Sequence, residues 1–557
     1  MEREGCTIQA PPLSPRRSPP VWSDSLLRWV DRQRRVLFAG LALIYLAGFN
    51  GQWRMEEPDS ALYLTLARNI ATGHGYTYHG KANAAAYPGL PYLLSLIYRL
   101  SPSSHRDPLN LVGENLLMPL MAAATLGLTY RLMRLNAGRP TAVLVTLTVG
   151  LTRTFYRAAF ALMTDMPFAM GVMAFLAGYE GWMQRERRGK EEKIGAQRWI
   201  DVMLMLLGGV TTIVMRPTWI SLAPVTAIGL IIAGVRRKIS WKVAAAGLGL
   251  TLAAAAVFYV ADPRRGAGKF RSDRYEDQVI QQFASAGPGQ LAAAAEFRGW
   301  DLLRQTAVSA LLGIKFGPAP DAPGVRHWYD ILGAAVDVAG ATATLVLGIA
   351  LLRRRAVWGL CILATLAMMV LVQEHERYFL PILPLLIFAW WRGLRWVSLR
   401  LAKWGADSWA AGIGNIFLGL ALAMGIMPNA LHVCGIIIEQ RRVPFFTRYR
   451  EGKCLPLIAA AKRLEQALPD TLVLAPDKTG RFLTYLSGRD VFESNEAPEM
   501  EWPQKGRRVY ILDDPNDSAF QQWIRDLGIK GSLAFSDGHN AEMGRLWLRR
   551  VPKGMLP

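Results

Sequence analysis

Acidic and basic side chains stand beside long apolar stretches at four places in this chain. They are Glu56, Glu57 and Asp59 in EEPD, Asp165 in LMTDMPF, Arg216 in RPT, and Glu374, Glu376, Arg377 and Tyr378 in QEHERY. A carboxylate can accept a proton from an attacking group, and an arginine can bind an anion. Because charged groups beside a membrane are costly to desolvate, these positions are candidates for a functional site.

Three of these places also have a purely structural interpretation. The acidic triplet is compatible with a solvated loop. Asp165 suits the first turn of a helix, where the helix dipole favours a carboxylate. Arg377 and Tyr378 suit anchors at the membrane interface. The choice between chemistry and structure depends on whether the four places face the same side of a membrane.

The elements that carry these residues are predicted membrane spans. The chain has 557 residues, of which 52% are apolar and 19% charged, and its mean hydropathy is +0.17. About eleven stretches approach the roughly 17–25 apolar residues that a span needs. They lie near 36–52, 109–130, 140–153, 158–180, 199–215, 218–235, 241–261, 330–352, 356–373, 378–391 and 410–432. We therefore expect a polytopic α-helical membrane protein.

The distribution of basic residues predicts which side each link between spans faces. Arg28, Arg32, Arg34 and Arg35 precede the first span, and every second link after it is basic. These five links, within 131–139, 185–198, 236–242, 353–355 and 392–403, hold 20 Lys and Arg, whereas the three short links opposite hold 4. The positive-inside rule then places the N-terminus in the cytoplasm and everything after about residue 433 outside, in a plasma (inner) membrane. All four candidate places face outward. The net charge of +21 is explained by these links, so nucleic acid is not expected as a partner.

Three regions follow from this topology. Residues 1–30 are rich in Pro, Ser and Arg and are predicted to be a disordered cytoplasmic tail. Residues 31–438 form the transmembrane domain, with outer loops at 53–108 and 262–329. In the first loop, Leu62, Leu66 and Ile70 repeat at helical spacing, which predicts a short helix at the membrane surface.

The composition becomes that of a soluble domain from about residue 440. A helical pattern in LPLIAAAKRLEQAL, a strand in TLVLAP, a helix that ends at YLSG, a strand in RRVYILDD, a helix in SAFQQWIRDLG and a strand near GSLAF follow one another. Strands that alternate with helices predict a small extracytoplasmic α/β domain over 439–557. Cys434 and Cys454 would lie on the same outer side of the membrane as this domain and could pair. Four scattered cysteines do not, however, indicate a disulfide framework or a metal site.

The first outer loop resembles that of the GT-C class of glycosyltransferases, which use lipid-linked sugars. The class includes protein O-mannosyltransferases and aminoarabinose transferases of lipid A. Their loop carries an Asp-Glu pair after the first span, then a Tyr, a Gly-Tyr turn and a Tyr-Pro-Pro-like segment. Here the matches are Asp59, Tyr63, Gly75–Tyr76 and Tyr87–Pro88. Further along, TDMPFAM, Arg216–Pro217–Thr218 and ERYFLPILPLL are similar to later motifs, so the resemblance covers about residues 30–435 in order.

Two positions depart from the pattern of the GT-C class. Ser60 stands where a Glu is usual, and Gly89 stands where a second Pro is common. The missing acid puts in doubt the role of a second carboxylate, for which Glu57 is a possible substitute.

The resemblance implies transfer of a sugar from a polyprenyl-phosphate donor to an acceptor hydroxyl. It implies Asp59 as the general base, assisted by Glu57 or Asp165, with inversion at the anomeric carbon. Arg377 and Arg216, with Lys269 or Arg271, would bind the phosphate, and the remaining substrate-binding candidates are Tyr63, Tyr87, Glu376 and Tyr378. The acceptor would be a hydroxyl of a protein, a lipid or a glycan. No cofactor is certain, and a divalent metal is left open, since His74, His79 and His375 lack a recognisable ligand spacing.

Two other functions remain open on the sequence alone. A transporter or flippase of lipid-linked sugars is also polytopic, although such proteins place binding groups near the midplane, often within inverted repeats that this chain lacks. A non-catalytic assembly protein with the GT-C fold is the other, and Ser60 favours it.

Overall fold

The computed structural model describes the helical domain and parts of the terminal domain. The described residues are 22–51, 58–83, 86–100, 108–188, 196–216, 227–232, 234–235, 344–352, 355–371, 376–404, 426–438, 454–465, 471–475, 479–493, 508–513, 533–534 and 547–551, with isolated positions between 245 and 342. Of the disordered tail expected at 1–30, residues 1–21 fall outside them, whereas 22–30 belong to a helix, α1 (Trp22–Arg32), so that part of the prediction is wrong. Nearly all of the second outer loop, expected at 262–329, also falls outside the described residues.

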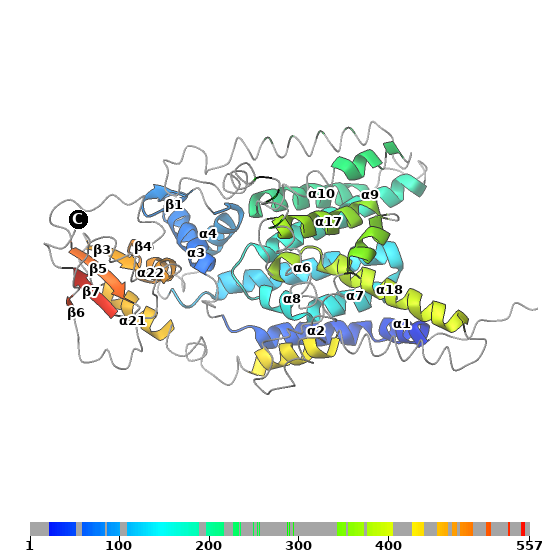
Figure 1. Cartoon of the computed structure of the whole chain (residues 1–557), viewed down its shortest axis with the longest axis horizontal. Helices are drawn as coiled ribbons and strands as arrows, with labels where there is room; N and C mark the ends of the chain where they lie inside the picture. The colour runs from blue at the N-terminus through cyan, green and yellow to red at the C-terminus, as the bar shows by residue number, and fades with distance from the viewer. Residues whose placement is uncertain are drawn as a thin grey trace, which may run out of the picture.

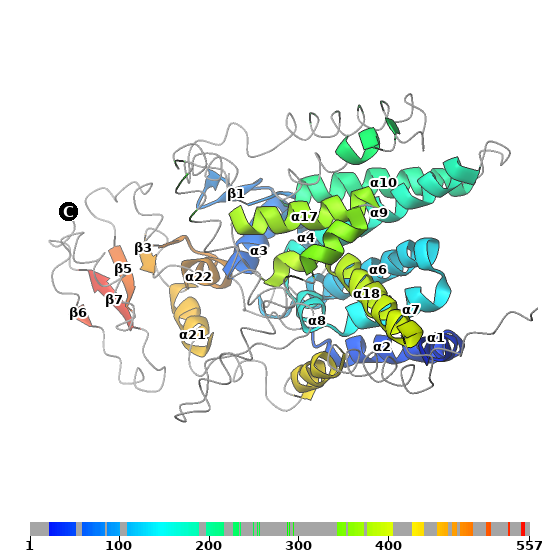
Figure 2. The same cartoon turned by 45° about the vertical axis from the view of Figure 1, so that its right-hand side comes forward.

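A bundle of helices forms the larger part of the molecule (Figures 1 and 2). It contains α1 (Trp22–Arg32), α2 (Arg34–Gly48), α6 (Val112–Ala137), α7 (Arg139–Leu151), α8 (Arg153–Ala158), α9 (Asp165–Arg188), α10 (Ala196–Met215), α17 (Ala356–Leu371) and α18 (Leu383–Trp404). Helix α9 packs on α10 and α6, and α7 packs on α6, α1 and α18. Among the described residues, 112–137 and 197–215 are long and apolar enough to cross a membrane. The count of about eleven spans stays a prediction.

Two of the expected spans begin later than the hydropathy indicated. The stretch at 158–180 is wrong as one span, because α8 ends at Ala158 and α9 begins only at Asp165. The stretch at 378–391 is also wrong, because the 3-10 helix η2 (Glu376–Phe379) precedes α18, which runs from Leu383 to Trp404. Prolines explain both starts, since proline suits the first turn of a helix and disfavours helix in the residue before it. Pro167 lies in the first turn of α9, and Pro381 and Pro384 flank the start of α18.

Glycines bring α9 and α10 into close contact. A Cβ atom added at Gly208 would lie 2.6 Å from the carbonyl oxygen of Gly171 and would also meet the backbone nitrogen of Phe175. At Gly178 a Cβ would lie 2.5 Å from the carbonyl oxygen of Asp201. Small residues allow helix backbones to approach in membranes. The close packing fixes the start of α9 beside the end of α10.

The segment predicted as the first outer loop (53–108), called the outer loop below, forms two helices and a short hairpin. They are α3 (Pro58–Ala71), β1 (Thr77–Tyr78), β2 (Lys81–Ala82) and α4 (Gly89–Leu100). The helix predicted from Leu62, Leu66 and Ile70 is confirmed, but this stripe is not directed at lipid. Leu62 and Leu66 are buried against Tyr76 and Tyr78 of the hairpin segment, with Phe492 of the terminal domain beside them.

The terminal domain contains a five-stranded mixed sheet. The elements are α21 (Cys454–Glu465), β3 (Thr471–Ala475), α22 (Thr479–Ser487), β4 (Val491–Glu493), β5 (Arg508–Asp513), β6 (Leu533–Ala534) and β7 (Trp547–Val551), and the strand order is β4-β3-β5-β7-β6. Strand β3 is parallel to β4 and β5, whereas β7 is antiparallel to β5 and β6. The predicted helices and strands at 454–513 and the strand near GSLAF are confirmed, while β4 and β7 are additional. The expected helix in SAFQQWIRDLG lies outside the described residues. Cys434 is a free cysteine, so the possible disulfide with Cys454 is not formed.

The outer loop lies between the terminal domain and the helical bundle in both views (Figures 1 and 2). Helix α3 packs against α4 on one side and α22 of the terminal domain on another. Ala61, Leu64 and Ala67 of α3 join the main hydrophobic core. The position of α3 is therefore determined by both domains.

Candidate functional site

Asp165 and Arg216 meet at one end of the α9–α10 pair. Asp165 is in the first turn of α9, where the carbonyl of Thr164 accepts a hydrogen bond from the N–H of Phe168 at 3.0 Å. Arg216 directly follows α10, and its Nη1 forms an ion pair with Oδ1 of Asp165. Both side chains are largely buried, at 3% exposure for Asp165 and 14% for Arg216. The carboxylate therefore holds the guanidinium in place.

The helix η2 presents Arg377 and Tyr378 to the same place. The carbon Cζ of Arg216 lies 4.5 Å from the centroid of the Tyr378 ring, and Cζ of Arg377 lies 5.6 Å from it. Phe379 and Leu380 are buried behind them and fix this turn in the core. An aromatic face that attracts cations thus gathers two guanidinium groups, which suits an anion with several oxygens.

Tyr63 connects α3 to this cluster. It lies one helical turn beyond Asp59, forms a side-chain hydrogen bond with Thr164, and is within electrostatic range of Asp59, Asp165 and Arg216. Because α3 lies outside the predicted spans, Tyr63 is not in a membrane-spanning segment. Desolvation raises the pKa of the Tyr63 phenol well above its ordinary value, and the Asp59 carboxylate adds to this shift. The phenol therefore keeps its proton and can act as a hydrogen-bond donor.

The Tyr87–Gly89 segment packs beside the end of α10. Tyr87 is buried, at 4% exposure. A Cβ atom at Gly89 would lie 2.7 Å from the carbonyl oxygen of Val214 and 2.9 Å from Sδ of Met215, which directly precedes Arg216. Proline also carries a Cβ, so this close approach explains why Gly89 replaces the second proline.

Asp59 lies in the first turn of α3 and contacts the terminal domain. Its Oδ1 accepts a hydrogen bond from Nη1 of Arg481, on α22, at 2.6 Å. The Asp59 side chain is 40% exposed, and that of Arg481 is 12% exposed. The neighbouring Ser60 is buried, so the residue at the position of the second acid has little access to solvent.

The remaining candidates fall partly outside the described residues. Glu57, Lys269, Arg271 and His375 lie outside them, and Glu376 begins η2 but its side chain is not described. Nδ1 of His79 lies 3.1 Å from Oδ1 of Asp490. Within the described part of the chain, no group of three or more His, Cys, Asp or Glu side chains is placed to hold a metal ion.

The structure thus brings together Asp59, Tyr63, Asp165, Arg216, Arg377 and Tyr378, with Tyr87 close to the end of α10. Sequence reasoning missed Thr164, Arg481 and its partner Glu493. Arg481 carries no local signal, because its relation to the site depends on a contact with Asp59, which is 422 positions away in the sequence.

Comparison with known proteins identifies the architecture. No protein-family model and no curated protein matches the sequence. Among solved structures, ArnT from Cupriavidus metallidurans in the apo state is similar over 96% of this chain and 99% of its own, at 12% identity and a TM-score of 0.52. The same protein bound to undecaprenyl phosphate is similar over 94% and 98%, at 13% identity and a TM-score of 0.55.

A second similar structure is an archaeal oligosaccharyltransferase. AglB from Archaeoglobus fulgidus, in complex with an inhibitory peptide and a dolichol-phosphate, is similar over 87% of this chain and 70% of its own, at 13% identity and a TM-score of 0.54. ArnT and AglB are both glycosyltransferases of the GT-C class. At such identities the likeness establishes the fold, and it confirms the resemblance seen in the outer-loop motifs. The chain is therefore mostly helical and has the GT-C fold, and its described residues include two helices long and apolar enough to cross a membrane.

Proposed function

We propose that this protein transfers a sugar from a polyprenyl-phosphate donor to an acceptor hydroxyl at the outer face of the membrane, with inversion of the anomeric centre. The observation that carries the proposal is the cluster at one end of the bundle, where Tyr63 lies within electrostatic range of both Asp59 and Arg216, and the Tyr378 ring gathers Arg216 and Arg377. One structure with the same fold holds undecaprenyl phosphate and another holds a dolichol-phosphate, which supports a donor of that class.

The cluster supplies the groups that such a transfer needs. Asp59, partly exposed at the start of α3, would take the proton of the acceptor hydroxyl as that oxygen attacks the anomeric carbon. Arg216 and Arg377 would stabilise the charge that develops on the departing phosphate, with Lys269 or Arg271 in support. Oδ1 of Asp165 pairs with Arg216, which favours for Asp165 a role in holding this cation.

Tyr63 and Tyr378 complete this site. The protonated phenol of Tyr63 would donate a hydrogen bond to the sugar or the phosphate. The ring of Tyr378 would keep the two guanidinium groups together. Apolar helix faces would hold the lipid chain, as the spans of a membrane domain readily do.

The topology belongs to the same proposal. About eleven spans place the N-terminus in the cytoplasm and the terminal α/β domain outside, which puts the cluster on the outer face of a plasma (inner) membrane. Labelling of single introduced cysteines in intact cells tests it. A residue in the basic link at 236–242 should be protected, and one after residue 540 should react with an impermeant reagent.

The test of the activity uses purified protein and a panel of radiolabelled polyprenyl-phosphate sugars. Release of free polyprenyl phosphate with transfer of label is expected, and Asp59→Asn should reduce the rate by at least roughly 10²-fold, the scale of general base catalysis. Asp31→Asn is the matched control, because Asp31 also pairs with an arginine, Arg139 at 2.7 Å, but at the end of α1.

Three outcomes would contradict the proposal. Normal transfer by a correctly inserted Asp59→Asn protein removes the base assignment. Movement of a labelled lipid-linked sugar across a vesicle bilayer without cleavage indicates a flippase. Absence of both transfer and movement with every donor in the panel indicates a non-catalytic protein with the GT-C fold.

A further inference from the structure

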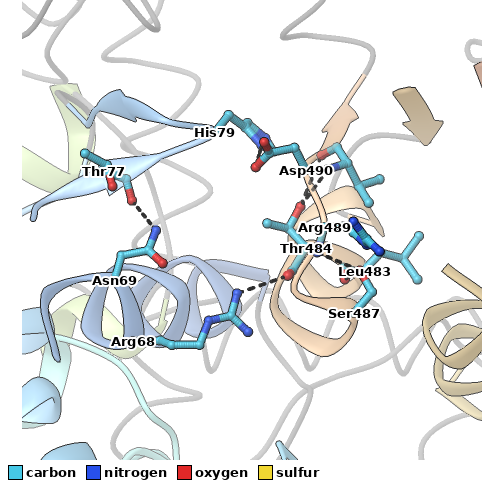
Figure 3. A network of polar contacts seen from close by, with 10 residues as sticks. Arg68, Asn69, Thr77, His79, Leu483, Thr484, Ser487, Arg489 and Asp490 are labelled. Atoms are coloured by element: carbon cyan, nitrogen blue, oxygen red, sulfur yellow. Dashed lines mark hydrogen bonds and ion pairs between the residues drawn. The ribbon is translucent and has the colours of Figure 1, made fainter. Parts of the chain in front are cut away.

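The terminal domain is attached to the outer loop by a set of polar contacts (Figure 3). Arg68 of α3 donates hydrogen bonds to the carbonyl oxygens of Tyr485 at 2.9 Å and Thr484 at 3.4 Å, both on α22. Nδ1 of His79 lies 3.1 Å from Oδ1 of Asp490, just beyond α22. One set of contacts comes from α3 and the other from the turn of the hairpin between β1 and β2, and together they fix α22 relative to the outer loop.

Arg481 is held firmly inside its own domain. Its backbone N–H donates a hydrogen bond to Oε1 of Glu493 at 3.0 Å, and its Nε lies 3.5 Å from Oε2 of the same carboxylate. Glu493 ends β4 and is fully buried. A Cβ atom at Gly480 would lie 2.6 Å from Cγ of Glu493, so only glycine permits this approach. The start of α22 is therefore built around the Glu493 carboxylate.

The other end of the same side chain reaches Asp59. Nη1 of Arg481 contacts Oδ1 of Asp59 at 2.6 Å, which is short even for a charge-assisted hydrogen bond. Among the described residues no other donor contacts Asp59, and Oδ2 accepts no hydrogen bond from them. With 40% of the side chain exposed, the carboxylate stays accessible to a substrate.

We propose that Arg481 is a positioning residue for the transfer, supplied by the terminal domain to the base of the membrane domain. By holding Oδ1, Arg481 orients Oδ2 of Asp59 toward the acceptor hydroxyl. This inference rests on the proposed function. The proton of the hydroxyl moves to Oδ2 as the acceptor oxygen bonds to the anomeric carbon and the bond from that carbon to the phosphate oxygen breaks. Arg481 keeps its own proton throughout, because guanidinium does not deprotonate in proteins.

A positioning role differs from simple attachment of one domain to the other. The contacts of Arg68 and of His79 with Asp490 already attach the domains, and none of them touches Asp59. Loss of Arg481 should therefore misdirect the base without separating the domains. A misplacement of about 1 Å in a reacting group can cost roughly 10²-fold in rate.

The experiment compares Arg481→Gln, Arg481→Lys and, as the matched control, Asp490→Asn in the full-length protein, with the radiolabelled donor that the wild type uses best. Arg481→Gln should lower kcat about 10- to 100-fold and change KM for the donor less than about threefold. Arg481→Lys should recover part of kcat, and Asp490→Asn should stay near wild type. Arg481→Gln combined with Asp59→Asn should be no slower than Asp59→Asn alone, because Arg481 acts through Asp59.

Hydrogen exchange at the first turn of α3 adds a measurement that needs no activity. Exchange there should rise in Arg481→Gln and not in Asp490→Asn. The inference would be overturned, with the proposed function intact, if Arg481→Gln and Asp490→Asn lowered kcat equally. It would also be overturned if the losses of Arg481→Gln and Asp59→Asn multiplied in the double variant. If no donor is turned over, the proposed function fails, and unchanged exchange in Arg481→Gln would then refute the coupling by itself.

Discussion

The glycine contact between α9 and α10 gives a sharp prediction about how the cluster is held. Gly208→Ala places a methyl group 2.6 Å from the carbonyl oxygen of Gly171, about 0.8 Å less than the 3.4 Å at which ordinary contact begins. That oxygen belongs to the helix backbone, so it cannot rotate away as a side chain would. The two helices must separate locally or tilt.

The size of the effect follows from two opposed terms. Alanine in place of glycine favours a helix by up to about 1 kcal/mol. Overpacking of a close interface costs roughly 1–3 kcal/mol. Gly209→Ala, one residue along, gains the helix propensity of alanine without the overpacking cost, because a Cβ there meets no atom within 4 Å. The two variants should therefore differ in free energy of unfolding by about 1–3 kcal/mol, with Gly208→Ala the less stable.

The rate of sugar transfer should fall as well. Gly208 lies eight residues before Arg216, about 12 Å along the helix axis at 1.5 Å per residue. A shift of several tenths of an ångström there moves Arg216 relative to Asp165 and Tyr378, so we expect at least a roughly tenfold loss of kcat.

The assay is unfolding in mixed detergent micelles together with transfer from the radiolabelled donor, for both variants in parallel. If Gly208→Ala matches Gly209→Ala in both measurements, the close packing of α9 on α10 does not position the cluster. A loss of activity that is equal in the two variants would lead to the same conclusion.

Three further predictions concern the ion pairs and the aromatic contact. Asp165→Asn should lower the free energy of unfolding by about 3–5 kcal/mol, because it leaves the buried Arg216 without its carboxylate partner. Adding Arg216→Met should restore part of this stability. Wild-type stability of Asp165→Asn would contradict a buried ion pair at this place. The hydrogen bond from His79 lowers the pKa of Asp490 below its ordinary value of 3.8. This contact therefore stabilises the docking of α22 above pH 3.8 and is lost as the pH falls through the lowered pKa. Pepsin cleavage near α22 should rise between about pH 4 and pH 2 in the wild type but not in Asp490→Asn. Tyr378→Phe keeps the aromatic face, so its affinity for undecaprenyl phosphate should be within about threefold of wild type. Tyr378→Leu loses about 0.5–2 kcal/mol of cation–π attraction and should bind this lipid more weakly. Equal affinities of the two variants would exclude a role of the Tyr378 ring in holding the arginines.

Local patterns predicted the elements that form from local interactions. The spacing of Leu62, Leu66 and Ile70 predicted α3, and the apolar run in TLVLAP predicted β3. The stripe on α3 was expected to face the membrane surface, yet it packs on the hairpin and on Phe492, because partners outside the helix decide which surface covers an apolar face. The span expected at 378–391 failed because hydropathy does not register the prolines at 381 and 384.

Long-range pairing limited what could be predicted of the sheet and of the site. Strand β4 has only three residues, and β7 is recognisable mainly through its register with β5, where Ile511 pairs with Arg549. The basic residues between spans predicted that Asp59, Asp165, Arg216 and Arg377 share one side, which is compatible with their proximity here. No spacing rule could predict Arg481, because its position depends on how two separately folded parts dock.

The contact between α3 and α22 also has a consequence for synthesis of the chain. The carbonyl groups that accept hydrogen bonds from Arg68 lie 416 and 417 residues further on, and the guanidinium that holds Asp59 lies 422 residues further on. At about 5–20 residues per second, the ribosome needs roughly 20–80 s to make that interval. For this time the outer loop is exposed with its polar partners missing, and the Leu62–Leu66 stripe lacks Phe492. A chain that stops before residue 481 therefore lacks the guanidinium that holds Asp59, so this face of the protein can assemble only after the first half of the terminal domain has been made.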